Sequence, residues 1–318
     1  MPGQEVTKSF ICIVKPIALN PTLQLLQFLL LANFPSGSSI NYYENKLYLL
    51  GDDARTIIIL DTHYRLLDSL RLFDYPEKRI PKSKKIDLES SAIVTIAGNK
   101  HLVALGSAST IDRKKILLVP LTAEGTIDHS KPVVSNSTSV FVDRLTNGGV
   151  KVVNIEGATV MGHNLILANR GSRNDPRNYL IITGEDFWSR QKEAALRIVP
   201  IELSGSHSEF LGISELFYVE SKDMILFTFT SEGTNNAYDD GVIGGSYIGW
   251  MKNVGAKLKQ AKLRLDGMIK LSATSNEFKN QKIEGICVER VSGGELLLHL
   301  ISDNDNGETK LFKALLKF

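Results

Sequence analysis

The chain has 318 residues, of which 43% are hydrophobic and 23% are charged, and its formal net charge is +2. This composition excludes a disordered or fibrous chain and is that of a globular protein with a sizeable core. The small excess of positive charge gives no electrostatic reason to bind nucleic acid, so we expect no nucleic-acid partner.

The first predicted element is a strand over Lys8–Ile17, written KSFICIVKPI. The next apolar stretch, PTLQLLQFLLLANF from Pro21 to Phe34, is ambiguous between a strand connection and a short capping helix. It is too short and too polar for a membrane span of about 20 residues, so we expect no membrane insertion. No basic segment leads directly into a clean apolar core with a cleavage site, which leaves the compartment open: cytoplasmic, or periplasmic if a signal peptide has been removed.

A motif then recurs five times along the chain. Each copy has a polar or acidic residue, a short apolar strand, a turn, and a second apolar strand that ends in polar residues. Aligned on one position, the copies are separated by 50, 67, 59 and 69 residues. The aligned residues are Ser39, Glu89, Glu156, Glu215 and Glu284.

One or two further strand-like runs follow each copy, such as KKILLVPL then VFVDRL, and NYLIITG then ALRIVPI. Units of about four strands repeated at this spacing are typical of a β-propeller, whose radial packing protects the sheet edges. A β-sandwich with chance similarities is the competing interpretation, but it gives no reason to repeat an acidic position before a strand. We therefore predict an all-β fold, a single β-propeller domain over residues 1–318 with five blades, six being the alternative.

The last copy is followed only by TKLFKALLKF, which supplies a third strand and leaves the final blade without a fourth. We expect the N-terminal strand Lys8–Ile17 to close the ring by pairing with Leu311–Leu315, because an isolated apolar strand would leave its backbone groups unpaired. This closure would bring Cys12 near Cys287, and with only 2 cysteines we expect buried thiols, not a disulfide framework or a zinc site. Earlier in the chain, Gly233–Gly249 is rich in Gly, Asn and Asp and is predicted to be an exposed loop.

The repeated acids indicate a site on the propeller axis. Residues just before the inner strands converge on one mouth of the central channel, where like charges raise each other's pKa unless a cation neutralises them. Ca²⁺ accepts about six to eight oxygen ligands in flexible geometry, which such a ring can supply. The predicted metal ligands are Glu89, Glu156, Glu215 and Glu284.

Polar residues at the ends of the second strands give a predicted ligand-binding set: Arg113, Asn169, Arg170 and Asp303. The two arginines are also alternative neutralisers. If they fold over the carboxylates, the mouth is a salt-bridged plug that needs no metal. The sequence leaves open both arrangements, and a third in which the carboxylates point apart. The first copy has Ser38 and Ser39 where the others have Glu, so the ring is not wholly acidic.

The stretches DLES then LGSAST with Arg113, and NIEGA then NRGSRND, resemble a bacterial β-propeller family known as a domain of unknown function. The likeness covers nearly the whole chain. More distantly, EGI and SDN in the last copy are similar to esterase-like phytase domains and SdiA-regulated-like propellers. These relatives imply a five- or six-bladed propeller with Ca²⁺ at the axis.

Three classes of function remain. The resemblance favours a metal-dependent hydrolase of phosphate or carboxylate esters, in which Ca²⁺ polarises the ester oxygen and a carboxylate acts as general base. The alternatives are a non-catalytic propeller that binds a ligand or partner, and a purely structural ring. The sequence has no Gly-x-Ser-x-Gly elbow and no phosphate-cradling loop, and its 6 histidines form no metal-ligand pair, so no catalytic residue is assigned. We expect a monomer with a small-molecule ligand.

Overall fold

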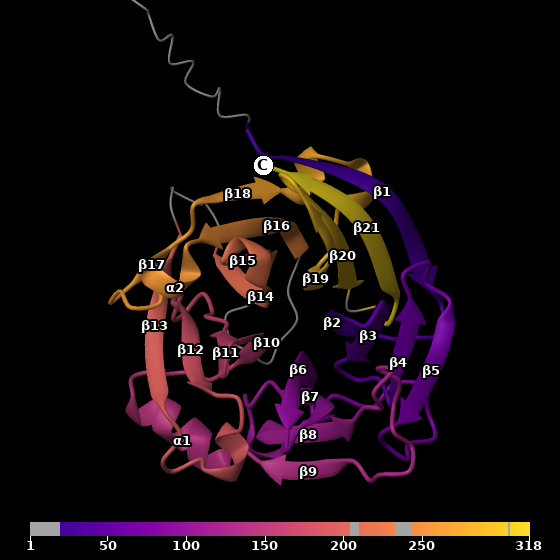
Figure 1. Ribbon diagram of the computed structural model, residues 1–318, viewed down its shortest axis with the longest axis vertical. Coiled ribbons are helices and arrows are strands. Elements are labelled where there is room, and N and C mark those ends of the chain that lie inside the picture. Colours follow the sequence, from indigo (N-terminus) through magenta and orange to yellow (C-terminus); the bar gives the residue numbers. More distant parts are fainter. Residues whose placement is uncertain (1–19, 204–209, 233–242, 305) are drawn as a thin grey trace, which may run out of the picture.

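A computed structural model describes residues 20–203, 210–232, 243–304 and 306–318. These residues form five sheets arranged as a ring around a central axis, as Figure 1 shows. The innermost strand of each sheet contacts the innermost strands of the two neighbouring sheets, so the inner strands surround a central channel. The chain is therefore a five-bladed β-propeller, which confirms the predicted fold.

The blades are numbered in chain order, with the innermost strand first. Blade 1 consists of β2 (Gly37–Tyr43), β3 (Lys46–Gly51), β4 (Thr56–Asp61) and β5 (Leu66–Arg71). Blade 2 consists of β6 (Leu88–Ile96), β7 (Asn99–Gly106), β8 (Lys115–Pro120) and β9 (Val134–Ser137). Blade 3 consists of β10 (Ile155–Met161), β11 (Asn164–Asn169), β12 (Asn178–Gly184), β13 (Leu196–Glu202) and the short β17 (Leu263–Arg264).

Blade 4 consists of β14 (Leu211–Val219), β15 (Met224–Glu232), β16 (Ile243–Lys252) and β18 (Gly267–Lys270). Blade 5 consists of β19 (Ile283–Ser292), β20 (Glu295–Asp303), β21 (Thr309–Lys317) and β1 (Thr22–Leu31). The helices are α1 (Ser139–Asn147), α2 (Val254–Lys257) and the 3-10 turns η1 (Ile111–Arg113), η2 (Phe187–Ser189), η3 (Glu220–Lys222), η4 (Leu271–Ala273) and η5 (Asn276–Phe278). Among the described residues, no helix is long and apolar enough to span a membrane.

The second strand of each blade is buried on both faces because it lies within its sheet and between two neighbouring blades. Such strands read as nearly continuous apolar runs rather than as alternating ones. Examples are KLYLLG in β3, NLILAN in β11 and ELLLHLISD in β20, in which almost every residue is buried. The repeat seen in the sequence is this pair of inner strands.

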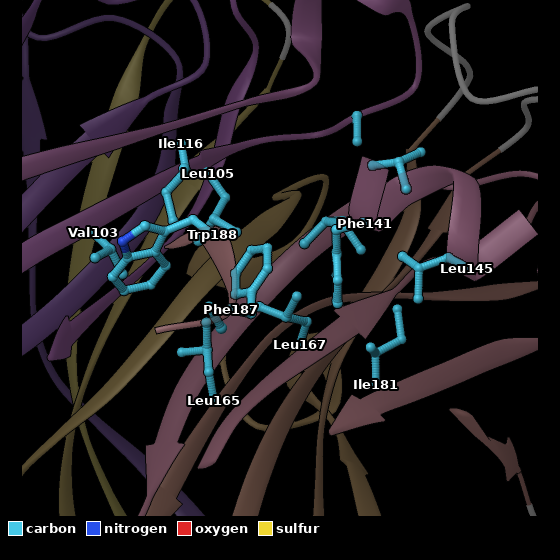
Figure 2. Packing of buried hydrophobic residues seen from close by; sticks show 14 of the residues in the cluster. Val103, Leu105, Ile116, Phe141, Leu145, Leu165, Leu167, Ile181, Phe187 and Trp188 are labelled. Carbon is cyan, nitrogen blue, oxygen red and sulfur yellow. The ribbon is translucent and has the colours of Figure 1, made fainter. Parts of the chain in front are cut away.

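The apolar core is divided into clusters that lie between neighbouring blades. Figure 2 shows the cluster between blades 2 and 3, where α1 and η2 pack against the sheets. Phe141 of α1 and Phe187 of η2 are both buried, with ring centroids 4.3 Å apart. The run VFVDRL, predicted as a strand, is part of this helix, and the strand prediction was wrong. Its buried residues, Phe141, Val142 and Leu145, follow a helical spacing, and the outer strand of blade 2 is the preceding β9.

The strand that completes blade 5 is β1, in the place predicted for Lys8–Ile17. β1 pairs antiparallel with β21, with Leu29 opposite Leu311. The other edge of β21 pairs with β20, so no edge is left for Lys8–Ile17, which lies outside the described residues together with Cys12. The ambiguous segment Pro21–Phe34 is therefore a strand over most of its length.

Part of the predicted loop Gly233–Gly249 is also a strand. Its residues from Ile243 onward belong to β16, which pairs with β15 on one side and with β18 on the other. Its glycines misled the prediction, because glycine in a strand is tolerated where another chain segment approaches closely. At Gly249 an added Cβ would lie 2.9 Å from Leu265 and 3.0 Å from Phe229. Residues 233–242 lie outside the described residues.

Candidate functional site

Each inner strand carries a β-bulge near its first residues. The register against the second strand skips one residue in every blade, and such bulges re-aim a side chain without breaking the sheet. The skipped residues are structurally equivalent around the ring. They are Ser38, Glu89, Glu156, Ser214 and Glu284. Three of the four predicted glutamates thus occupy one equivalent position at the end of the channel, which we call the axial mouth.

Glu215 occupies a different position. In blade 4 the order of acid and small residue is exchanged, so that Ser214 is at the bulge and Glu215 follows it. The Oε2 atom of Glu215 accepts a hydrogen bond from Ser39 Oγ at 2.8 Å, and Ser39 belongs to blade 1, which is not a neighbour of blade 4. The Oε1 atom accepts the backbone N–H groups of Ala158 and Leu216, each at 3.0 Å. This carboxyl therefore lies across the central channel.

Further polar side chains join Glu215 in the channel. Ser39 Oγ lies 2.8 Å from Ser91 Oγ, to which the Asn41 amide donates at 2.6 Å. We call Ser39, Asn41, Ser91 and Glu215 the axial plug. Glu215 is 1% exposed, and burial raises its pKa well above the usual value. The channel is so narrow here that a Cβ at Gly157 would lie 2.8 Å from Glu215 Oε1.

Glu156 is buried at the axial mouth between a neutral and a cationic partner. Its Oε1 atom accepts the Asn154 amide at 2.6 Å, and its Oε2 atom lies 3.7 Å from Arg170 Nη1. Burial raises the pKa of Glu156 to about 8, although Arg170 lowers it, and the neighbouring Glu284 raises it further. A carboxyl with such a pKa exchanges its proton near neutral pH.

Glu284 has a cation of its own. Lys282 Nζ lies 3.0 Å from Glu284 Oε1, and the side chains of both residues are largely buried. Within the described part of the chain, the Oε2 atom of Glu284 is buried without a hydrogen-bond partner. The lysine two residues ahead of the glutamate faces the same side of the strand, because side chains alternate along a strand.

The acids of blades 1 and 2 meet around a lysine. Lys85 Nζ binds Asp52 and lies 2.8 Å from Asp87 Oδ1, and Arg113 Nη1 lies 2.6 Å from Asp87 Oδ2. Burial opposes ionisation of Asp87, but Lys85 and Arg113 outweigh it and lower the pKa of this carboxyl. Asp52 has a raised pKa of about 6, mainly because it is buried. One oxygen each from Asp52, Asp87 and Glu89 lie within 4.8 Å of one another.

Glu89 differs from the other acids of the mouth. It is partly exposed, and within the described ranges its carboxyl makes no hydrogen bond or ion pair. Burial of the carboxyl, followed by repulsion from Asp87, Glu156 and Asp52, raises the pKa of Glu89 well above the usual range. Glu89 is therefore a carboxyl whose protonated form is favoured by its surroundings, and its side chain is partly exposed.

The spacing of Asp52, Asp87 and Glu89 would allow a metal ion to bind. However, the ammonium group of Lys85 already binds two of the three carboxylates. The donor set therefore does not fit Ca²⁺ as it stands, because a divalent ion would have to displace Lys85. Of the four glutamates predicted to bind a metal, Glu89, Glu156 and Glu284 occupy the bulge positions at the mouth, and Glu215 lies in the axial plug.

The predicted ligand-binding residues have different surroundings. Arg113 and Arg170 are buried beside Asp87 and Glu156. Asn169 is 1% exposed and holds the chain ahead of Glu156, because its amide oxygen accepts Asn154 N–H at 2.8 Å. Asp303 lies at the rim of the mouth, in a small pocket between blades 1 and 5.

Sequence reasoning missed Lys85 and Lys282 as the cations of the mouth. A signal for Lys282 was present in the sequence. In three copies a polar residue stands two positions before the bulge glutamate, as Asp87, Asn154 and Lys282. All three lie on the same side of their strands as the glutamates and supply hydrogen bonds or ion pairs at the mouth. Lys85 lies in an irregular connection, where no periodicity indicates the direction of a side chain.

The family model described as "Family of unknown function (DUF6929)" matches residues 33–316. No curated protein matches the sequence. Among solved structures, the chain is similar to the glutaminyl cyclase of Myxococcus xanthus, with 13% identity, a TM-score of 0.52, and coverage of 93% of this chain and 97% of that chain. It is also similar to the periplasmic gluconolactonase of Pseudomonas aeruginosa, with 10% identity, a TM-score of 0.41, and coverage of 86% and 83%. At 13% identity, the likeness to the glutaminyl cyclase supports the fold alone.

Proposed function

This chain belongs to the family of unknown function DUF6929, and we propose from its site that the axial mouth binds a small polar molecule. We further propose that the mouth hydrolyses an ester or phosphoester bond of this molecule by general acid–base catalysis. The observation that carries the proposal is the environment of Glu89. Its side chain is partly exposed, and burial of the carboxyl together with repulsion from Asp87 and Glu156 raises its pKa, which favours the protonated form. Perturbed carboxyls in a concave site are candidates for proton transfer.

The proposed chemistry assigns a role to each group. Water attacks the ester carbon or the phosphorus and gives up a proton to solvent, and Glu89 in its protonated form, as a general acid, donates a proton to the leaving oxygen as the bond to it breaks. Glu156, with a pKa of about 8, is the second proton-exchanging carboxyl of the mouth and is held in place by Asn154. Arg113 and Arg170 provide fixed positive charge for an anionic transition state, which is the kind of stabilisation that usually contributes most to acyl and phosphoryl transfer.

The test uses p-nitrophenyl acetate and p-nitrophenyl phosphate with the wild-type chain and Glu89→Gln. Glutamine keeps the shape of the side chain but cannot donate a carboxyl proton, so we expect a loss of about 100-fold or more in kcat. Glu124→Gln, at an exposed glutamate remote from the mouth, is the matched control and should have no effect. Hydrolysis that is undiminished in Glu89→Gln would contradict the proposed acid.

A non-catalytic propeller that binds a ligand at the mouth is the alternative. The ion pairs that fix Asp87, Glu156 and Glu284 favour it, because they make the mouth rigid and largely neutral. A chain that binds a ligand at the mouth and has no hydrolytic activity toward any ester or phosphoester would support this alternative.

Ca²⁺-assisted hydrolysis is a further candidate, favoured by the spacing of Asp52, Asp87 and Glu89. Calorimetric titration with Ca²⁺ separates it from the metal-free proposal. If Lys85 is the resident cation, Ca²⁺ should bind to Lys85→Met and not to the wild-type chain, while Lys84→Met, at an exposed neighbouring lysine, should behave as wild type. Ca²⁺ binding to the wild-type chain that is lost in Glu89→Gln would favour the metal-assisted reaction instead.

A further inference from the structure

The pocket that contains Asp303 is a polar cavity adjoining the axial mouth. It has a volume of about 290 Å³ and lies between the turn after β3, the connection from blade 1 to blade 2, and the end of β20. It shares Asp52 and Lys85 with the carboxylate cluster of the mouth. The cavity therefore adjoins the carboxylate cluster to which Glu89 belongs.

The cavity wall carries both signs of charge in equal number. Three acidic and three basic side chains line it, namely Asp52, Asp53, Asp303, Arg79, Lys82 and Lys85. A ligand with a single charge would be attracted by three of these groups and repelled by the other three. A ligand with an ammonium group and a carboxylate group can place each of its charges next to an opposite one.

Arg79 can receive the carboxylate. Its Nε atom donates to Asp53 Oδ2 at 2.6 Å, and this is its one hydrogen bond to a side chain within the described ranges. Its side chain is 45% exposed, and a guanidinium binds a carboxylate with two parallel hydrogen bonds. Gly307 leaves room for it, since a Cβ there would lie 2.9 Å from Arg79 Nη1.

Two carboxylate oxygens on the acidic side of the cavity wall have no hydrogen-bond donor within the described residues. The Oδ1 atoms of Asp52 and Asp53 are buried and have no hydrogen-bond partner in the described part of the chain. Asp53 is 4% exposed, and a desolvated carboxylate oxygen without a donor destabilises the folded state. An ammonium group has three N–H donors, enough for both carboxylates.

We propose that this cavity binds the zwitterionic end of a small molecule, with its carboxylate on Arg79 and its ammonium group facing Asp52 and Asp53, and therefore that the ligand is an α-amino acid or a derivative of one. The inference rests on the proposed function in one respect only, because it takes the ligand of this cavity to be the small polar molecule that the mouth binds. The volume is at the small end for ligand sites, which suits a compact head group.

The test is calorimetric titration of the full chain with L-amino acids and matched fragments. Propionate is L-alanine without its amino group, ethylamine is L-alanine without its carboxylate, and D-ribose represents an uncharged polyol. At least one L-amino acid should bind at least about tenfold more tightly than either singly charged fragment. Equal binding of propionate or ethylamine, preferred binding of D-ribose, or no binding by any of the L-amino acids would overturn the proposal.

A pair of arginine variants tests the position of the site. Arg79→Gln should weaken binding by about tenfold or more. Arg177→Gln is the control, because Arg177 also binds an aspartate through Nε, at 2.7 Å to Asp175, and is 47% exposed, but lies in blade 3. If Arg79→Gln leaves the affinity for amino acids unchanged, the amino acid does not bind in this cavity and the proposal is wrong. Amino-acid binding that depends on Arg79, without any hydrolysis by the wild-type chain, would instead leave this inference standing and remove the proposed reaction.

Discussion

Replacing Glu215 by glutamine should make the protein more stable above pH 5, although the residue lies at the centre of the ring. The carboxyl is almost fully buried, and burial raises its pKa well above the usual 4.5. The protonated, neutral form is therefore favoured more strongly in the folded protein than in the unfolded chain. A glutamine amide has the shape of the neutral carboxyl, can accept the Ala158 and Leu216 N–H groups, and can donate to Ser39 Oγ.

The sign of the effect follows from proton linkage. A carboxyl with a raised pKa in the folded state contributes its full stability below the unfolded pKa and loses it as the pH rises towards the folded pKa. Each pH unit in this window costs the wild type about 1.4 kcal/mol relative to a side chain that does not titrate. The stability difference between Glu215→Gln and wild type should therefore increase in favour of glutamine from about pH 5 upwards.

Urea unfolding followed by circular dichroism from pH 5 to pH 8 measures this difference. Glu215→Ala is the contrasting variant. It leaves two backbone N–H groups and the Ser39 hydroxyl without their acceptor, at about 1–3 kcal/mol for each buried group, so it should be destabilising at every pH. Parallel stability curves for Glu215→Gln and wild type would refute the neutral carboxyl, and a glutamine variant as unstable as the alanine variant would refute the described hydrogen bonding.

Three further predictions concern the channel, the ring closure and the core. Gly157→Ala should lower the melting temperature by an amount equivalent to about 1–3 kcal/mol, because its Cβ would lie 2.8 Å from Glu215 Oε1 and 2.7 Å from Leu216, and a wild-type melting temperature would contradict the tight channel. Deleting residues 20–31 should cause insolubility, because β21 would lose its outer partner, and a soluble deletion variant with wild-type unfolding would show that β1 does not close the ring. Phe187→Ala should cost about 3–5 kcal/mol in urea unfolding, whereas a loss below about 1 kcal/mol would mean that the contact with Phe141 is not close-packed.

The fold could be predicted because the pair of apolar inner strands recurs at blade spacing. The channel residues could be predicted less well, because one residue of register decides which way a side chain points. The sequence aligns Glu215 with Glu156 as the acid of its copy, yet the bulge in blade 4 falls on Ser214, and Glu215 enters the channel. Only the hydrogen-bond register distinguishes Ser214-Glu215-Leu216 in this blade from Glu156-Gly157-Ala158 in blade 3.

The closing strand was misplaced for a related reason. Two segments near the N-terminus are apolar and strand-like, KSFICIVKPI and TLQLLQFLLL. From their hydrophobic pattern alone, either could form the edge strand of the final blade. The pairing of Thr22 with Lys317 and of Leu31 with Thr309 could not be read from either segment alone, because register depends on both strands.

The pairing of β1 with β21 joins segments from nearly opposite ends of the chain. During synthesis β1 leaves the ribosome before the other strands of the ring, and its partner emerges only after the four other blades have been made. For all that time an uncharged ten-residue strand, with Leu26, Phe28 and Leu30 nearly half exposed even in the finished ring, has no partner on either edge. Pairings between distant segments also form slowly, because the long intervening loop has to be closed. Production of this protein should therefore depend on chaperones that bind extended apolar segments, more than its folded stability would suggest.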